Sequence, residues 1–219
     1  MNANALPRDP RSLPPDVRLL KRGERFLEPD VYVLDVDGRP AVVKDYGRYR
    51  RSPLSLLARL LVRREARVLD RLRGWRHAPA LLGTIGGLAL GMEFIAGQTL
   101  GEAALDAGSH VFQQLRGAVA SLHAAGITHN DLHPANVLVA GSTPVLIDFA
   151  SAMRTPRWLR GLPLVRELRR SDLANLVKMR QRLTGQPPSA REAELLAPPR
   201  WVDAIRLGWK RVYRRLKGA

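Results

Sequence analysis

The segment at residues 127–150 constrains the fold more than any other part of the chain. It reads Ile-Thr-His-Asn-Asp-Leu-His-Pro-Ala-Asn-Val-Leu-Val from residue 127, and Val-Leu-Ile-Asp-Phe-Ala from residue 145. The apolar runs 137–139 and 145–147 flank a turn at 141–144 and therefore predict a hairpin. That hairpin returns Asp148 to the loop that carries Asp131 and Asn136. Two carboxylates and an amide at one mouth are hard oxygen ligands of the kind that Mg²⁺ prefers.

The rest of the pattern predicts two unlike halves. The first contains short strands at 17–20, 31–36 and 41–44, one helix between Ser52-Pro53 and Gly74, and a second hairpin at 81–92. The second contains a helix over 111–122 that ends at Gly126, the hairpin above, and a mainly helical remainder with Ser171 as an N-cap. We expect an α+β fold with a flexible N-terminus at 1–15, an antiparallel-sheet N-lobe plus one helix at 16–95, and a helical C-lobe at 96–219 that ends in a basic helix.

The spacing H-x-D-x-x-x-x-N, followed by D-F, resembles the catalytic loop and metal-binding turn of the protein-kinase-like superfamily. The resemblance implies a reduced bilobal fold that uses ATP and Mg²⁺. It implies that Asp131 is the catalytic residue, which orients an acceptor hydroxyl and takes its proton. It further implies that Asn136 and Asp148 hold the metal.

Upstream residues extend the same resemblance. Lys44 ends the run Ala41-Val42-Val43, close to the V-A-I-K pattern of a kinase strand, and so would contact the ATP phosphates and pair with Glu65 on the first helix. Backbone groups near Glu93, Phe94 and Ile95 would bind the adenine. Taken alone, Lys44 and Glu65 also fit a solvated strand end and a solvated helix face.

Several kinase motifs are absent or altered in this chain, and these differences indicate which members of the superfamily it resembles most. The glycine-rich loop is missing, Ala150 replaces the glycine of D-F-G, and no A-P-E segment follows. The chain is closer to RIO kinases and to the lipopolysaccharide core (Kdo and heptose) kinases, and residues 131–136 are also similar to aminoglycoside and choline phosphotransferases. We expect a kinase that transfers the γ-phosphoryl group to a hydroxyl of a protein Ser/Thr or of a lipid-linked lipopolysaccharide core sugar. The sequence does not separate these acceptors.

Three residues allow a second interpretation. His129 and His133, four positions apart, could form part of a zinc site, although Pro134 favours a loop over the continuous helix that such a pair needs. In the kinase interpretation, His129 is instead a buried residue that braces the loop. Asp172 is either a first-turn carboxylate favoured by a helix dipole or a buried anchor for the catalytic-loop backbone.

Composition bears on partners. There are 36 Lys and Arg against 20 Asp and Glu, a net charge of +16, and no cysteine, which excludes disulfides and thiol catalysis. Between His77 and Met153 the only Lys or Arg is Arg116, so the excess charge lies outside the predicted chemistry and suggests an anionic acceptor or the inner-membrane surface. An aromatic content of 5% makes nucleic acid the less favoured partner.

The two ends of the chain bear on where the protein is located, and its basic surface allows an alternative function. Residues 1–15 lack the apolar core of a secretory signal, so we expect a cytoplasmic protein. Residues 201–216 have an amphipathic, basic pattern that suits either an ordinary surface helix or a helix on the cytoplasmic face of the inner membrane. The alternative to an enzyme is a non-catalytic, pseudokinase-like module that binds membrane or RNA through its basic surface.

Overall fold

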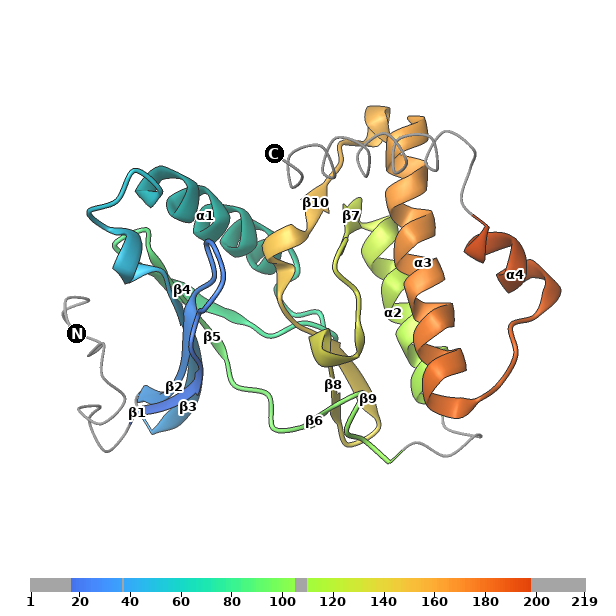
Figure 1. Cartoon of the computed structure of the whole chain (residues 1–219), viewed down its shortest axis with the longest axis horizontal. Coiled ribbons are helices and arrows are strands. Elements are labelled where there is room, and N and C mark those ends of the chain that lie inside the picture. Colours follow the sequence, from blue (N-terminus) through green and yellow to red (C-terminus); the bar gives the residue numbers. More distant parts are fainter. Residues whose placement is uncertain (1–16, 37, 105–109, 198–219) are drawn as a thin grey trace, which may run out of the picture.

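Five antiparallel strands form the sheet of the N-terminal half, in the order β1-β2-β3-β5-β4 (Figure 1). The structure is a computed structural model and describes residues 17–36, 38–104 and 110–197. The strands are β1 (Val17–Lys21), β2 (Asp30–Val36), β3 (Arg39–Asp45), β4 (Leu81–Ile85) and β5 (Ala89–Glu93). In β3, the central strand, Ala41, Val43 and Lys44 are buried. This strand therefore delivers its lysine into the interior of the molecule.

One long helix, α1 (Ser55–Arg71), packs against β4 and β5. Its buried residues recur at helical spacing because one face of an amphipathic helix must cover the sheet; they are Ala58, Val62, Glu65, Val68 and Leu69. Glu65 is the one charged member of this set. The expected sheet and single helix of the first half are confirmed.

Helices dominate the second half. They are α2 (Val111–Ala124), α3 (Pro163–Thr184) and α4 (Ala190–Leu196). A small sheet in the order β6-β8-β9 lies between them and the first half, and β7 pairs with β10; the bounds are β6 (Gln98–Thr99), β7 (Ile127–Thr128), β8 (Val137–Ala140), β9 (Thr143–Leu146) and β10 (Met153–Arg154). Single turns occur at η2 (Gly47–Tyr49), η3 (Pro134–Asn136), η4 (Phe149–Ser151) and η5 (Arg157–Leu159).

The core of this half joins α2 to the hairpin of β8 and β9. One cluster contains fully buried side chains from α2, from the end of β9 and from the turn after it; they are Leu115, Val119, Leu122, Leu146 and Phe149. The predicted hairpin is present, with Val137 opposite Leu146. Because the hairpin is anchored on α2, the loop before β8 and the turn after β9 are held at one end of it.

One local expectation was wrong, and one short strand was missed. Ser171 does not cap a helix, because α3 already begins at Pro163 and Ser171 lies inside it. Strand β6 was not expected, since two residues are too few to show an alternating pattern. The predicted N-terminal tail at 1–15 and the basic helix at 201–216 lie outside the described residues. None of the described helices has the length and apolar character needed to cross a bilayer.

Candidate active site

The loop before β8 is held by one buried carboxylate, Asp172 of α3. Its Oδ2 accepts the backbone N–H of His129 at 2.8 Å, and its Oδ1 accepts the backbone N–H of Asn130 at 2.9 Å. His123 Nε2 also lies 2.9 Å from Oδ2. The side chain is fully buried, and it lies well inside α3. Of the two interpretations of Asp172, the structure therefore favours the anchor of the loop backbone.

His129 packs inside the protein, where it contacts the segment that leads to Asp148. It is fully buried, its Nε2 lies 3.1 Å from the carbonyl oxygen of Ile147, and its ring centroid lies 5.0 Å from that of Phe149. Burial lowers the pKa of His129 below its ordinary value. The segment is a loop with Asn130 at φ 65°, and the described residues contain no group of three or more His, Asp or Glu side chains placed to hold a metal. The zinc interpretation thus lacks both its helix and its ligands.

Asp131 and Asn136 face one another across the same loop. Asn136 Nδ2 donates to the backbone carbonyl of Asp131 at 2.9 Å and to its Oδ2 at 3.2 Å. Asn136 is buried, whereas the Asp131 side chain is half exposed. The Asp131 carboxylate is thus oriented by its partner and still open to an incoming group.

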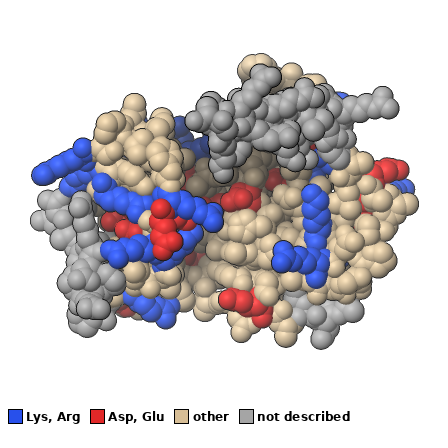
Figure 2. Space-filling model, viewed as in Figure 1, with Lys and Arg blue, Asp and Glu red and all other residues tan. Residues whose placement is uncertain are grey.

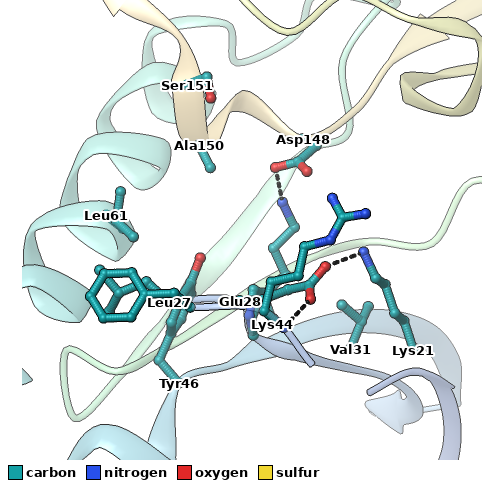
Figure 3. Close-up of a pocket in the computed structure, with 13 residues that line it drawn as sticks. Lys21, Leu27, Glu28, Val31, Lys44, Tyr46, Leu61, Asp148, Ala150 and Ser151 are labelled. Carbon is teal, nitrogen blue, oxygen red and sulfur yellow. Dashed lines mark hydrogen bonds and ion pairs between the residues drawn. The ribbon is translucent and has the colours of Figure 1, made fainter. Parts of the chain in front are cut away.

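Lys44 joins the two halves of the molecule. Its Nζ lies 2.7 Å from Glu65 Oε1 on α1. It also lies 2.7 Å from Asp148 Oδ1 beyond β9, a contact that Figure 3 shows. Burial alone would lower the pKa of Lys44, but the two carboxylates together outweigh burial and hold its pKa above the ordinary value. The pairing of Lys44 with Glu65 that the resemblance implied is present.

Asp148 sits at a strained turn. It adopts left-handed backbone angles, φ 62° and ψ 70°, which non-glycine residues rarely do. Glu65 Oε1 also accepts the backbone N–H of Phe149 at 3.2 Å, so the carboxylate of α1 contacts both Lys44 and the residue after Asp148. Although burial opposes it, the Lys44 ammonium holds the pKa of Asp148 below its ordinary value.

Residues 22–30 stand where the glycine-rich loop is missing. Glu28 Oε2 accepts the backbone N–H groups of Glu24 and Arg25 at 3.0 and 2.9 Å, and Arg48 donates to the carbonyls of Gly23 and Glu28. Gly23 is required here, since an added Cβ would lie 2.4 Å from the Glu28 carbonyl oxygen. The side chains of Glu28 and Arg48 order this loop together with Gly23, a feature that the sequence analysis missed.

The loop covers a pocket of about 450 Å³ that Lys44 and Asp148 also line (Figure 3). Glu28 faces the pocket and pairs with Lys21 at 2.5 Å. The Lys21 ammonium, with the backbone N–H of Arg25, lowers the pKa of Glu28 to about 2. The pocket thus places a charged lysine and a carboxylate against an ordered backbone loop.

The predicted adenine-binding residues are not part of this lining. Glu93 ends β5, where its N–H donates to the Ala80 carbonyl at 2.9 Å and its Oε2 accepts the Ala80 N–H at 3.0 Å. Phe94 and Ile95 follow in the connection between β5 and β6. Their role in nucleotide binding stays a prediction.

Two further contacts hold the segment after Asp148, and the sequence analysis missed both. Arg64 of α1 donates to the carbonyls of Ala152 and Ser151 at 2.6 and 2.8 Å. Asn130 Nδ2 donates to the same Ser151 carbonyl at 3.0 Å. The only sequence feature that could have pointed to Arg64 is its position next to Glu65. The carbonyl of Ser151 therefore accepts hydrogen bonds both from α1 and from the loop before β8.

Comparisons with known proteins agree with this geometry. The model of the phosphotransferase enzyme family APH matches residues 102–196. A probable bifunctional tRNA threonylcarbamoyladenosine biosynthesis protein of Methanothermobacter thermautotrophicus is 32% identical over 143 residues, which are 63% of this chain and 25% of that protein. The chain thus spans about a quarter of this curated relative.

Solved structures show the same fold. Rio2 kinase of Chaetomium thermophilum in a complex with ADP, Mg²⁺ and phosphoaspartate is 17% identical, with a TM-score of 0.60 over 81% of this chain and 60% of that chain. A second Rio2 structure from the same organism is 16% identical, with a TM-score of 0.59 over 81% and 62%. The α+β, reduced kinase-like fold predicted from the sequence is confirmed. The chain thus has a protein-kinase-like fold, and it is similar to the phosphotransferase family model over residues 102–196 and to the curated relative over 63% of its length.

Proposed function

We propose that the protein is a kinase that uses ATP and Mg²⁺ to transfer the γ-phosphoryl group to a hydroxyl. One observation carries the proposal: Lys44 lies 2.7 Å from both Glu65 and Asp148, inside the pocket that residues 22–30 cover. Burying an ammonium group between two carboxylates from different halves of the chain carries a desolvation penalty. Binding of a polyphosphate explains why the protein keeps this arrangement.

Each residue then has a role in the transfer. Lys44 holds the α- and β-phosphates, and Glu65 fixes the lysine. Asp131, oriented by Asn136 and open to solvent, accepts the proton of the acceptor hydroxyl. The hydroxyl oxygen forms a bond to the γ-phosphorus while the bond from that phosphorus to the bridging oxygen breaks, and the electron pair leaves with ADP. Positioning and charge neutralisation therefore supply most of the rate.

The oxygen donors at the site fit Mg²⁺. Because Asn136 donates through Nδ2 to Asp131, its amide oxygen is the acceptor left for an ion. The Asp148 carboxylate is the second protein ligand, and Mg²⁺ is commonly held by one or two carboxylates plus substrate phosphates. When bound, the ion neutralises charge on the phosphates.

The acceptor is a protein Ser/Thr or a lipid-linked core sugar. Between η4 and α3 the structure places only β10 and η5, which is a short segment on which to dock a peptide. Labelling a cell extract with γ-labelled ATP, and then separating protein, lipid-linked sugar and RNA, assigns the acceptor by the fraction that takes the label.

Asp131→Asn tests the reaction itself. We expect it to lower phosphotransfer by roughly 100-fold to 10,000-fold, as loss of a general base does, while nucleotide binding is retained. Asp148→Ala should abolish turnover with Mg²⁺. The control is Asp70→Asn, which removes only an exposed ion pair with Arg73 on the outside of α1. Unchanged turnover in Asp131→Asn, or a wild-type protein that binds membrane or RNA and turns over no ATP, contradicts the proposal.

A further inference from the structure

The first turns of α1 expose apolar side chains that the fold does not use. Leu56, Leu57 and Leu60 are 67%, 46% and 51% exposed. Single exposed leucines are ordinary on protein surfaces, but three on neighbouring turns of one helix form a contiguous apolar patch of the kind that marks an interaction site. In Figure 2 an uncharged bulge occupies the position that α1 has in Figure 1, and Lys and Arg side chains border it.

The stretch of sequence that contains this patch carries almost only positive charges. From residue 46 to residue 69 the only carboxylate is Glu65, which is buried against Lys44. Several arginines of this stretch are already bound to backbone carbonyls, as Arg59 is to that of Gly86 at 2.6 Å. In contrast, the side chains of Arg51, Arg63 and Arg67 are exposed and form no hydrogen bond or ion pair with another described residue. We call these three arginines and the three leucines the α1 outer surface.

We propose that the α1 outer surface binds the headgroup region of an anionic bilayer. Leucines that enter the boundary between headgroups and acyl chains, flanked by arginines that meet lipid phosphates, are the chemistry of an interfacial amphipathic helix. The opposite face of α1 carries Glu65 toward Lys44, so that docking occupies no residue of the candidate site. The proposal is independent of the proposed phosphotransfer.

Other occupants fit this surface less well. A second copy related by a two-fold axis would bring the same arginines against one another, which like-charge repulsion disfavours. RNA would pair with the arginines but gain nothing from the leucines. Of the two rings nearest to Arg51 in the sequence, Tyr46 is buried and Tyr49 lies under the guanidinium of Arg48, so neither is free to stack on an unpaired base.

Co-sedimentation of the full chain with vesicles tests the proposal, in the absence of ATP. The vesicles contain phosphatidylcholine alone or phosphatidylcholine mixed with phosphatidylglycerol. We expect binding to the mixed vesicles only. Each arginine near an anionic surface contributes roughly fivefold to partitioning, so the triple variant R51Q/R63Q/R67Q should lose on the order of 100-fold. L56S/L57S/L60S should lose a similar amount, because the apolar anchor is gone.

The matched control is K178Q/R182Q/R191Q, which removes the same charge from exposed positions of α3 and α4. It should partition like the wild type, since screening confines each charge to its own neighbourhood. Unchanged melting temperatures show that all variants fold, as expected for exposed positions.

Four results would overturn the proposal. They are no binding to anionic vesicles, equal binding to neutral ones, wild-type partitioning of both α1 variants, and a loss in the control as large as in R51Q/R63Q/R67Q. A dimer in sedimentation velocity that L56S/L57S/L60S abolishes, without vesicle binding, would assign the patch to a second copy. RNA binding that needs the arginines but not the leucines, again without vesicle binding, would assign it to nucleic acid.

Discussion

Arg64 donates from Nε to the carbonyl oxygen of Ala152 at 2.6 Å, across 88 positions of sequence. The same guanidinium reaches the Ser151 carbonyl at 2.8 Å, beside the contact of Glu65 with the Phe149 N–H. Helix α1 is thereby fastened to the backbone that follows Asp148. The acceptors of Arg64 are backbone carbonyl groups. The alignment of Lys44, Glu65 and Asp148 therefore needs no additional charged group, such as a phosphorylated side chain, in order to form.

Arg64→Gln should loosen this alignment. We expect turnover to fall about tenfold or more, because small displacements of positioning groups are costly to transfer rates, while nucleotide affinity changes little. Steady-state kinetics with an ADP-release assay measures both. Arg64→Lys, which keeps one donor group, should recover part of the loss. Arg63→Gln is the matched neighbour, and a loss in solution equal to that of Arg64→Gln would refute the positioning role.

Asp172→Ala should destabilise the whole protein. It leaves the backbone N–H groups of His129 and Asn130 buried without their acceptor. Each such group costs about 1–3 kcal/mol, so urea denaturation should show a loss of about 2–5 kcal/mol in the free energy of unfolding. Asp172→Asn retains one acceptor oxygen and should lose less. Equal losses in the two variants would show that hydrogen bonding is not what Asp172 provides.

Gly23→Ala and Gly117→Ala should have opposite effects. At Gly23 the new Cβ meets the Glu28 carbonyl at 2.4 Å, so residues 22–30 must shift; we expect a loss of about 1–3 kcal/mol in stability and a higher KM for ATP. At Gly117, inside α2, nothing lies within 4 Å, so alanine should stabilise the helix by about 0.5–1 kcal/mol with KM unchanged. Thermal unfolding and ATP kinetics check both. An unaltered KM in Gly23→Ala would separate this loop from the nucleotide.

Stability should fall in mild acid because of His129. Burial lowers its pKa in the folded state, whereas in the unfolded state it titrates near its ordinary pKa of about 6.5. Below that pH the unfolded state binds more protons, so the free energy of unfolding decreases as the pH falls. The contribution is complete above about pH 7 and is then lost by up to about 1.4 kcal/mol per pH unit.

Urea midpoints from about pH 7 to about pH 5 measure this dependence. His129→Gln cannot titrate and should flatten the slope, whereas His110→Gln, at an exposed position, should leave it unchanged. A slope that is the same in His129→Gln and in the wild type would assign the effect to other groups.

Most of the sheet, α1 and the catalytic loop could be predicted because their signals are local. The spacing from His129 to Asn136, and the apolar hairpin that leads to Asp148, determine which side chains meet at one mouth. The Lys44 and Glu65 pair followed only from the resemblance, since nothing near either residue shows that both are buried.

The parts that could not be predicted depend on distant partners. Residues 22–30 are ordered by Arg48, whose role is invisible until the chain has folded. The predicted start of this helix was wrong because Ser171 matches an N-cap pattern. Pro163 suits the first turn of a helix equally well, and tertiary packing selects this earlier start. Arg64 and Asn130 donate to backbone carbonyls, which carry no sequence signature.

The position of Asp172 in α3 sets a lower limit on the length of a fragment that could retain an ordered catalytic loop. A fragment that ended at residue 160 would contain Lys44, Asp131 and Asp148, and so every side chain to which we assign chemistry. It would lack the carboxylate that holds the backbone of His129 and Asn130, directly before Asp131. The smallest independent catalytic unit therefore extends past the last reactive residue by at least two turns of helix beyond Pro163, and excised versions of this domain should be cut after α3.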